Sequence, residues 1–391
     1  MLFKSIKLNR FLSFSDTAEA VDLRRLNLII GPNGCGKSNF LEAFALIRRV
    51  ATDDDLRLPV DAIYKSDGDF DSAAVEVEVV HAVNSVLRHR VSINHYQADE
   101  YAPPRETIDK LFRHFRPPQP PSPRCKSLYS FPAPGRKSGS MILEGSQWRA
   151  LSADEQRAEA SILGQLRDPD RFPEIAFLAD RYRSIRLFRD WRFGPSSPLR
   201  NVQSADRQNR FLEEDGSNLG LVLNRFQRLP KVKDRFLDAL RKLYQGITDY
   251  AVYIQPGTVQ VEMREAERMI PAARLSDGTV RYLCLLAILL EPDPPPLVCI
   301  EEPELGMHPD ILPTLAELLL EASERCQLVV TTHSDVLVDA MHDAPENVLV
   351  AEKDEQGTHL RRLSEKQLKP WLEQYRLGQL WMNGDIGGTR W

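Results

Sequence analysis

Residues 31–38 constrain what this chain can fold into more strongly than any other stretch. Their sequence, Gly31-Pro32-Asn33-Gly34-Cys35-Gly36-Lys37-Ser38, fits the pattern G-x-x-x-x-G-K-[ST] of a phosphate-binding loop. An apolar run at 26–30 precedes the loop as a buried strand would, and residues 39–47 follow it with apolar side chains at helical spacing. Strand, glycine-rich loop and helix together predict a nucleoside triphosphate site. A glycine turn that binds nothing is the alternative, and the Lys-Ser pair and both flanks argue against it.

The chemistry of such a P-loop gives each part of it a role. Glycines let backbone N–H groups converge on phosphate oxygens, and the N-terminus of the following helix adds positive potential. We expect Lys37 to reach the β- and γ-phosphates of ATP and the Ser38 hydroxyl to ligate Mg²⁺. The expected ATP contacts are Gly31, Pro32, Asn33, Gly34, Cys35, Gly36, Lys37, Ser38 and Asn39.

An acidic segment much later in the chain supplies the second half of this machinery. The apolar strand at 297–300 ends in Glu301-Glu302-Pro303-Glu304. Carboxylates at the carboxyl end of a parallel strand lie beside the phosphate loop, where the first acid supports Mg²⁺ and the next polarises the attacking water. Glu301 stands where aspartate is usual, so its contact with the metal could run through water. Ordinary solvated acids after a strand are the alternative.

Two further segments fit the same site. The strand at 329–332 ends in His333, which we expect to position the γ-phosphate. Ser276-Asp277-Gly278 opens a helix shortly before the acidic strand. Ser276 can act as a simple helix cap, or it can form an anion site with Gly278 at the helix N-terminus.

The 391 residues are 42% apolar and 27% charged, which suits a large core in two domains or in one domain with insertions. Alternating apolar residues early in the chain predict antiparallel strands, and from about 277 strands and helices alternate, which predicts a mostly parallel sheet covered on both faces. The expected strands are 2–12, 22–30, 74–80, 86–95, 141–143, 250–254, 258–263, 297–300, 327–331 and 347–350. The expected helices are 152–168, 216–237 with a break near Pro230, 277–290, 310–323 and one from about 334.

These elements suggest a single unit over 1–391 with recognisable parts. Residues 1–150 are expected to form an N-terminal β-rich lobe with the P-loop and a proline-rich basic insertion at about 100–138. Residues 151–247 are expected to form a helical insertion. Residues 248–391 are expected to form a C-terminal lobe that carries Ser276, the acidic strand and His333.

Two basic stretches are candidates for contact with nucleic acid, since a net charge of −5 leaves only a local patch for that purpose. Residues 105–137 carry eight Lys or Arg and lie among prolines. They form either a solvated insertion or a basic arm for DNA or a partner. Residues 181–192 interleave five arginines with large apolar side chains, which gives either a packed element with a basic face or a clamp for a nucleic-acid strand.

The motifs stand in the order P-loop, Leu-Ser-x-Gly, apolar strand with Glu-Glu-Pro-Glu, and Thr-His-Ser. In this order the chain resembles the ABC-type ATPase heads of the RecF, SMC and OLD kind, in particular the stand-alone "predicted ATPase" group labelled as AAA-family. The opening at 3–14, the Gly-Ser-Asn-Leu at 216–219 and the end at 381–391 with Gly387-Gly388 also resemble these heads. The resemblance implies an α/β P-loop NTPase fold of the ABC-ATPase head type, with an N-terminal antiparallel β subdomain, a mostly parallel central sheet covered by helices, and a helical insertion.

The resemblance also implies a mechanism in which two heads enclose two ATP molecules. Ser276 and Gly278 of one subunit would contact the γ-phosphate held by Lys37 of the other. Glu302 would then activate water while His333 positions it. Asp277 stands where glycine is usual and puts an acid near the incoming phosphate. Gln203 and Gln208 are candidates for the glutamine-loop ligand of these heads.

The resulting expectation is an ATPase that forms an ATP-dependent homodimer and acts in DNA repair and maintenance or in anti-phage defence. The alternative is a nucleotide-gated binding module with little turnover that regulates a separate effector such as a nuclease. An ATPase subunit of a membrane transporter is a poorer match to the motifs, and the segment after His333 is too short for an OLD-type nuclease domain. A cytoplasmic location is expected, because none of the five cysteines forms a C-x-x-C pair and the longest apolar run, 282–290, is too short to span a membrane.

Overall fold

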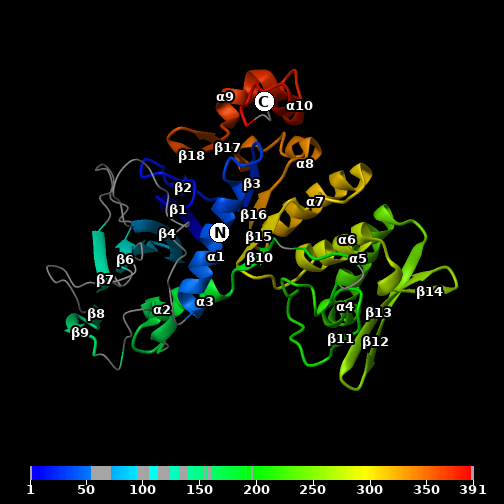
Figure 1. The fold of residues 1–391 in the computed structure, drawn as a ribbon, viewed down its shortest axis with the longest axis horizontal. Helices are drawn as coiled ribbons and strands as arrows, with labels where there is room; N and C mark the ends of the chain where they lie inside the picture. The colour runs from blue at the N-terminus through cyan, green and yellow to red at the C-terminus, as the bar shows by residue number, and fades with distance from the viewer. Residues whose placement is uncertain are drawn as a thin grey trace.

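The computed structural model describes residues 2–53, 72–94, 105–112, 124–131, 140–152, 155, 160–166, 168–189, 191–194 and 197–388. A central sheet separates two sets of elements, with an antiparallel sheet on one side and most of the longer helices on the other (Figure 1). The P-loop lies where one central strand meets the first helix.

Within the described residues, six strands form the central sheet in the order β10-β15-β16-β3-β17-β18. The first five are parallel, and β18 returns antiparallel to β17. Their bounds are β3 (Leu26–Ile30), β10 (Arg186–Phe188), β15 (Leu297–Glu301), β16 (Gln327–Thr331), β17 (Val348–Asp354) and β18 (Gly357–Arg362). The predicted mostly parallel sheet is confirmed, and the carboxyl ends of β3, β15 and β16 carry the P-loop, the acids and His333.

Alternate residues of the central strands pack into different cores, which is why these strands read as unbroken apolar runs. Leu28 and Ile30 pack against the helical side, whereas Ile29 packs against the side of the antiparallel sheet. Cys299 faces the same side as Ile29, and its neighbour Ile300 faces the helices. Burial of both faces fixes the register of the sheet and therefore the positions of the side chains at its carboxyl edge.

A second sheet, with eight strands in the described part of the chain, runs antiparallel in the order β2-β1-β4-β5-β6-β7-β8-β9. Its bounds are β1 (Phe3–Asn9), β2 (Val21–Asp22), β4 (Ser72–Ala82), β5 (Ser85–Asn94), β6 (Arg105–Phe112), β7 (Arg124–Phe131), β8 (Met141–Glu144) and β9 (Gln147–Ala150). The helix that follows the P-loop packs between this sheet and the central one. The predicted strand 22–30 is wrong as one element, because the Asn27 side chain bonds the backbone of Arg24 in both directions and makes a turn between β2 and β3.

The helices are α1 (Lys37–Thr52), α2 (Ile162–Gln165), α3 (Pro173–Arg183), α4 (Leu219–Gln227), α5 (Pro230–Leu243), α6 (Asp277–Leu289), α7 (Leu312–Ser323), α8 (Asp335–Asp339), α9 (Glu365–Leu372) and α10 (Leu377–Met382). The break at Pro230 and the helices near 277, 310 and 334 agree with the prediction. Of the predicted helix 152–168, only α2 is helical among the described residues, and 152, 155, 160, 161, 166 and 168 are not. Glu155 bonds the backbone N–H of Ser152 and pairs with Arg149, which holds the start of this segment in a turn.

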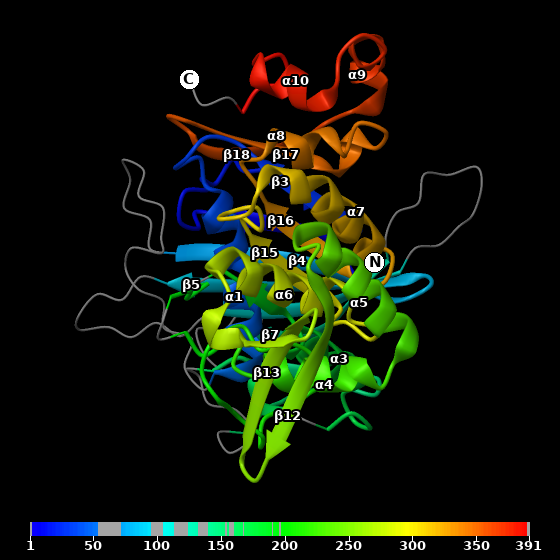
Figure 2. The same ribbon diagram turned by 90° about the vertical axis from the view of Figure 1, so that its right-hand side faces the viewer.

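A third sheet projects from the helical side, with β13 (Thr258–Glu265) paired to β11 (Gln203–Ser204), β12 (Ile247–Gln255) and β14 (Arg268–Pro271). Figure 2 shows the β12–β13 hairpin extending away from the central sheet. Residues 151–247, expected as a helical insertion, contain α2 to α5 but also β10, which joins the central sheet. The division of the chain at 150 and 247 remains a prediction.

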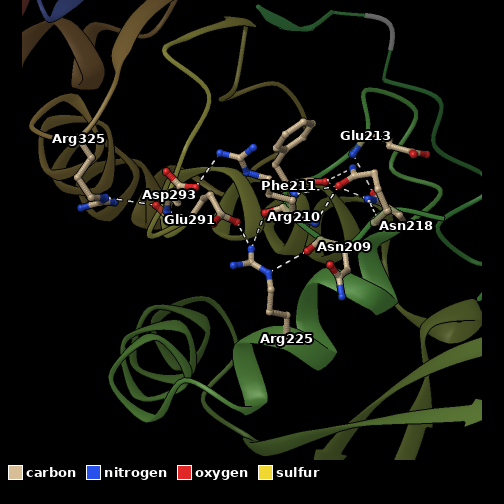
Figure 3. Close-up of polar contacts among 10 residues, drawn as sticks. Asn209, Arg210, Phe211, Glu213, Asn218, Arg225, Glu291, Asp293 and Arg325 are labelled. Atoms are coloured by element: carbon tan, nitrogen blue, oxygen red, sulfur yellow. Dashed lines mark hydrogen bonds and ion pairs between the residues drawn. The ribbon is translucent and has the colours of Figure 1, made fainter. Parts of the chain in front are cut away.

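The loop before α4 is fastened to the segment that follows α6 (Figure 3). Arg225 donates to the carbonyls of Asn209 and Arg210 at 2.8 and 2.7 Å and pairs with the buried carboxylate of Glu291. Arg325 donates to the Glu291 carbonyl at 3.4 Å. Burial raises the pKa of Glu291, although the Arg225 hydrogen bond opposes the shift. The ion pair therefore compensates a buried acid and ties the insertion to the helical face of the central sheet.

Candidate functional site

The P-loop is held open by backbone conformations that favour glycine. Gly31, Gly34 and Gly36 have φ angles of 152°, 79° and 105°. A Cβ at Gly31 would lie 2.3 Å from the carbonyl oxygen of Ala351, and one at Gly36 would lie 2.4 Å from the Thr358 hydroxyl. Both positions therefore need glycine for space as well as for conformation.

Hydroxyl groups from both ends of the chain support the outer side of this loop. Thr358 of β18 donates to the Cys35 carbonyl at 2.8 Å and is hydrogen-bonded to the Ser13 hydroxyl at 2.7 Å. Asn39 donates its side-chain amide to Ser13 at 2.8 Å. The Cys35 carbonyl thus has a hydrogen-bond donor on the side of the loop that faces β18. Two of the predicted ATP residues, Cys35 and Asn39, are therefore held in place by Thr358 and Ser13, which lie outside the motif.

Lys37 is buried and directs its ammonium group back into the loop. Its Nζ donates to the carbonyls of Gly31 and Pro32 at 2.8 and 2.9 Å. Burial lowers the pKa of Lys37, while nearby acids such as Glu302 oppose the shift. A desolvated ammonium held by neutral carbonyls is stabilised further by an anionic partner, and a phosphate is such a partner.

Ser38 and Glu301, the two residues predicted to hold Mg²⁺, meet directly. The Ser38 hydroxyl donates to Glu301 Oε1, and Arg189 Nε donates to Glu301 Oε2 at 3.2 Å. Arg189 also pairs with Glu42 of α1. A hydroxyl and a carboxylate are the hard oxygen donors that Mg²⁺ takes beside phosphate oxygens, so the residues present fit the metal.

Glu302 has an unusual backbone conformation for a residue with a side chain, with a φ of 45°. Its N–H donates to the Thr331 carbonyl at 3.0 Å, and its carbonyl accepts from Arg281 Nη2 at 2.5 Å. Its Oε1 lies 3.4 Å from Nε2 of His333. Strain of about 1–3 kcal/mol at such a position persists only where the surroundings hold it, and here both backbone groups of Glu302 are held.

Glu304 joins the turn after β15 to the end of β16. Its Oε1 accepts from the Thr332 hydroxyl at 2.8 Å and from the backbone N–H of His333 at 2.6 Å. Burial raises the pKa of Glu304, although these hydrogen bonds oppose the shift. The predicted neighbours Glu302 and His333 are therefore aligned by a third residue that the sequence analysis left without a role.

Ser276 and Gly278 lie at the start of α6, beside the turn after Glu302. The Ser276 hydroxyl caps α6 by accepting from the N–H of Thr279 at 3.1 Å. A Cβ at Gly278 would lie 2.7 Å from the Gly306 carbonyl oxygen. Asp277 accepts from Arg200 at 2.5 Å and from the Gly194 N–H at 3.1 Å, and the Arg200 hydrogen bond lowers its pKa. The structure thus confirms the cap, and the contact of Ser276 and Gly278 with a second subunit's nucleotide remains a prediction.

Arg281, in the next turn of α6, is a buried cation. Its guanidinium lies 5.5 Å from the ring centre of Trp191 and 5.6 Å from that of Phe193. Burial lowers its pKa, and nearby Glu304 and Glu302 oppose that shift. With its donation to the Glu302 carbonyl, Arg281 links α6 to the acidic turn.

The two glutamines proposed as loop ligands are elsewhere. Gln203 is buried in β11, where its Oε1 accepts from the Gly220 N–H at 2.7 Å. Gln208 bonds the backbone of Phe211 and Arg210 in the loop before α4. Both glutamines therefore hold local backbone in the insertion, and the assignment is wrong. Arg189, which follows β10, is the residue whose side chain reaches Glu301 from the insertion.

Three of the five arginines of 181–192 are bound within the protein. Arg183 donates to the carbonyls of Ala51 and Leu163, at the ends of α1 and α2, at 2.9 and 3.0 Å. Arg186 lies 4.4 Å from the Phe211 ring centre and donates to nearby carbonyls, and Arg189 pairs with acids. These three guanidinium groups serve packing, which favours the packed alternative for them, and contact of 181–192 with nucleic acid stays a prediction. In 105–137, residues 113–123 and 132–137 lie outside the described residues, and in 181–192 residue 190 does.

Sequence reasoning missed Arg189, Arg281 and Thr358. The run 185–188 is interrupted by Arg186, so no unbroken apolar strand marked the position of Arg189. Among the described residues, none of the helices is both long enough and apolar enough to cross a membrane.

With this geometry in place, comparisons with known proteins agree with the motif order. A family model described as "AAA domain, putative AbiEii toxin, Type IV TA system" matches residues 26–123 and 148–339. The Old nuclease of Escherichia phage P2 is 31% identical over 173 residues, which cover 40% of this chain and 29% of that nuclease. The chromosome partition protein Smc of Cereibacter sphaeroides is 51% identical over 43 residues, or 11% of this chain and 4% of that protein. The matches thus span less than a third of either relative.

Solved structures of Smc heads share the fold. The SmcHead bound to the C-winged helix domain of ScpA gives a TM-score of 0.58 at 15% identity and covers 94% of this chain and 99% of that one. The Smc head domain with an extended coiled coil, bound to the C-terminal domain of ScpA derived from Pyrococcus furiosus, gives 0.51 at 13% identity, with 95% and 99% covered. The predicted fold, an ABC-type ATPase head of the RecF, SMC and OLD kind, is confirmed.

Proposed function

This chain belongs to the AAA domain family whose model it matches, and we propose that it binds ATP with Mg²⁺ and hydrolyses it. One observation carries the proposal: Ser38 of the P-loop and Glu301 of the acidic strand, 263 residues apart, are hydrogen-bonded to each other. The next residue, Glu302, lies against His333. A phosphate cradle, a metal-binding pair and a carboxylate–imidazole pair therefore converge at one edge of the sheet.

Each residue has a role in this proposal. Backbone N–H groups of 31–38 bind the phosphates, and Lys37 exchanges its two carbonyl partners for phosphate oxygens. Ser38 and Glu301 would hold Mg²⁺, which would neutralise charge on the phosphates. Glu302 accepts a proton from the attacking water, and His333 orients the Glu302 carboxylate and the γ-phosphate.

The proposal includes a dimer in which each subunit completes the other's site. Ser276 is exposed at the N-terminus of α6, and Leu305, beside Gly306 in the adjacent turn, is 58% exposed although it is apolar. An exposed leucine next to an anion-binding helix terminus suits a surface that a second nucleotide-loaded copy covers. Asp277 does not prevent this approach, because Arg200 pairs with it and offsets its charge.

A role in DNA maintenance or anti-phage defence is the broader part of the proposal. The likeness to the Old nuclease of Escherichia phage P2 and to Smc supports it. DNA contact through 105–137 would depend on phosphate charges, so its affinity must fall between low and moderate salt. Affinity that is unchanged by salt would remove that stretch as the contact.

A second candidate is a nucleotide-gated module with little turnover that regulates a separate effector, such as a nuclease. The observation that favours it is Glu301 at the metal position, already paired with Arg189. Similar heads have been solved with ScpA bound, so a partner protein on such a head is feasible. Tight ATP binding without phosphate release, together with co-purification of a partner, would select this candidate over the first.

Two variants test the main proposal. Lys37→Ala should abolish ATP binding and phosphate release, while Lys7→Ala, an exposed lysine of β1, should leave both unchanged. Glu302→Gln should bind ATP, release phosphate at least 100-fold more slowly, and form a dimer with ATP and Mg²⁺ that size-exclusion chromatography with light scattering detects. A Glu302→Gln protein that stays monomeric at saturating ATP would exclude the shared site.

A further inference from the structure

Arg189 is a cation at the metal-binding edge of the sheet to which the proposed mechanism gives no role. It follows β10, the strand that pairs with β15 in parallel and matches Phe188 to Ile300. This register places Arg189 beside Glu301, and its Nε donates to Glu301 Oε2 at 3.2 Å. Its other end pairs with Glu42 of α1. Arg189 therefore lies between the metal-side acid and the helix that begins with the P-loop.

We propose that Arg189 is a positioning residue that aims the Glu301 carboxylate at Mg²⁺ and so allows glutamate to serve where aspartate is usual. This inference rests on the proposed function, because it concerns the Mg²⁺ that accompanies ATP. Arg189 does not touch the metal or the nucleotide in this scheme. It acts through one oxygen of Glu301.

The two oxygens of Glu301 have separate partners. Oε1 accepts from Ser38, the other metal-binding residue, whereas Oε2 accepts from Arg189. A glutamate has one more rotatable bond than an aspartate, so an unrestrained carboxylate would spread over more positions. With Oε2 fixed by the guanidinium, Oε1 stays directed at Ser38, where the metal must bind.

An opposing effect must be weighed, because a cation near the site also repels Mg²⁺. Arg189 is shared between Glu42 and Glu301, so the group of three carries a net negative charge and the repulsion is largely offset. Partners that orient a metal ligand typically change metal affinity by about 10- to 100-fold when removed. The orientation of Glu301 by Arg189 therefore outweighs the repulsion of Mg²⁺ by its charge, and loss of Arg189 must weaken Mg²⁺ binding.

The surroundings of Arg189 permit a clean substitution. Arg189 lines a cavity of about 720 Å³, together with Arg192, Phe193 and Glu214. A shorter side chain at this position therefore enlarges an existing cavity. Arg192 is exposed in the same cavity and serves as a matched control.

The test measures nucleotide binding in the full chain, apart from turnover. The dissociation constant of a fluorescent N-methylanthraniloyl-ATP is determined once with about 5 mM Mg²⁺ and once with EDTA. We expect Arg189→Gln and Arg189→Lys to reduce the Mg²⁺ enhancement of binding by about 10-fold and to leave the EDTA value unchanged. Arg192→Gln should match the wild type in both conditions.

A double-mutant cycle with Glu301→Asp separates positioning from other effects. The shorter aspartate lies beyond the reach of Arg189, so Arg189→Gln should have less than about a twofold effect in that background. An Mg²⁺ enhancement that stays equal to wild type in Arg189→Gln, or one that increases, would overturn the inference and leave ATP binding intact. Wild-type protein that binds the nucleotide in neither condition would instead refute the proposed function.

Discussion

Gly278→Ala tests the contact between the start of α6 and the turn that carries Glu302. The added Cβ would lie 2.7 Å from the Gly306 carbonyl oxygen, below the 3.0 Å that real Cβ atoms essentially never pass. The turn cannot yield cheaply, since Leu305 N–H bonds the Glu302 carbonyl at 3.1 Å and Met307 N–H bonds the Glu304 carbonyl at 3.0 Å. Displacement of the Gly306 backbone by the added Cβ should therefore also displace Glu302.

Two free energies of opposite sign decide the stability of this variant. Alanine gains up to about 1 kcal/mol over glycine inside a helix, and less in its first turn. Overpacking against backbone costs about 1–3 kcal/mol. We expect the free energy of unfolding to fall by about 0.5–2 kcal/mol, which at about 3 kcal/mol/M lowers the urea midpoint by a few tenths of a molar. Gly164→Ala is the control, because its Cβ would lie 3.6 Å from the Asp53 carbonyl oxygen, an ordinary contact.

The same displacement predicts the kinetic effect. A misplacement of 1 Å can cost about 100-fold in rate, so a shift of about 0.3 Å should lower kcat about fourfold. The ATP affinity of the monomer should not change, because the P-loop lies on a different strand. KM is not used as the readout, since in the proposed dimer Gly278 also faces the other subunit's ATP. Urea unfolding and steady-state phosphate release measure the two effects. A Gly278→Ala protein that gains stability, with unchanged kcat, would show that the close approach to Gly306 places no constraint on the site.

The remaining predictions concern the support of the loop and the acidic turn. Thr358→Val leaves the Cys35 carbonyl without its hydroxyl partner, which should lower the free energy of unfolding by about 1–3 kcal/mol and weaken nucleotide binding. Thr358→Ser keeps the hydroxyl and should keep the nucleotide affinity. Equal affinities for the two variants in a fluorescence titration would contradict this prediction. Because burial raises the pKa of Glu304 above 4.5, the folded protein holds that proton more tightly than the unfolded chain, so this group's contribution to stability is lost as pH rises from 4.5 through the raised pKa. Chemical denaturation over pH 4 to 7 should therefore show the stability of the wild type, relative to Glu304→Gln, falling as pH increases, and a constant difference would refute the assignment.

The sequence predicted the features whose partners are adjacent in the chain or whose positions follow from a strand end. The P-loop is contiguous with its strand and helix, and Glu301, Glu302 and His333 each end an apolar strand of a parallel sheet. Periodicity could not reveal that Asn27 would turn the chain between β2 and β3, because that turn depends on one side chain bonding the backbone of Arg24. Local pattern likewise predicted one helix over 152–168, whereas among its described residues only α2 is helical.

The residues that sequence reasoning missed bind across long separations. Arg189 and Glu301 are 112 residues apart, and Thr358 and Cys35 are 323 apart. A single sequence gives no distance between such positions, so the arginine-rich stretch could be read equally as packing or as a nucleic-acid clamp. The glutamine candidates failed for the same reason: polarity near the insertion was the only criterion, and the register of β10 against β15 decided which side chain reaches the acid.

The segment from Arg189 to Arg200 gives these separate contacts a common physical basis. It begins at the metal-side acid, places Trp191 and Phe193 against the buried guanidinium of Arg281, and ends where Arg200 pairs with Asp277 at the start of α6. Arg281 in turn donates to the Glu302 carbonyl. Among the described residues, the Arg281 Nε has no hydrogen-bond partner. Burial of this cation therefore costs free energy, and its retention is explained better by geometry than by stability. In the proposed dimer, the start of α6 would face the other subunit's ATP, and Glu302 would act on the ATP of its own subunit. Because both are fixed to the turn after β15, neither the start of α6 nor Glu302 could move without the other.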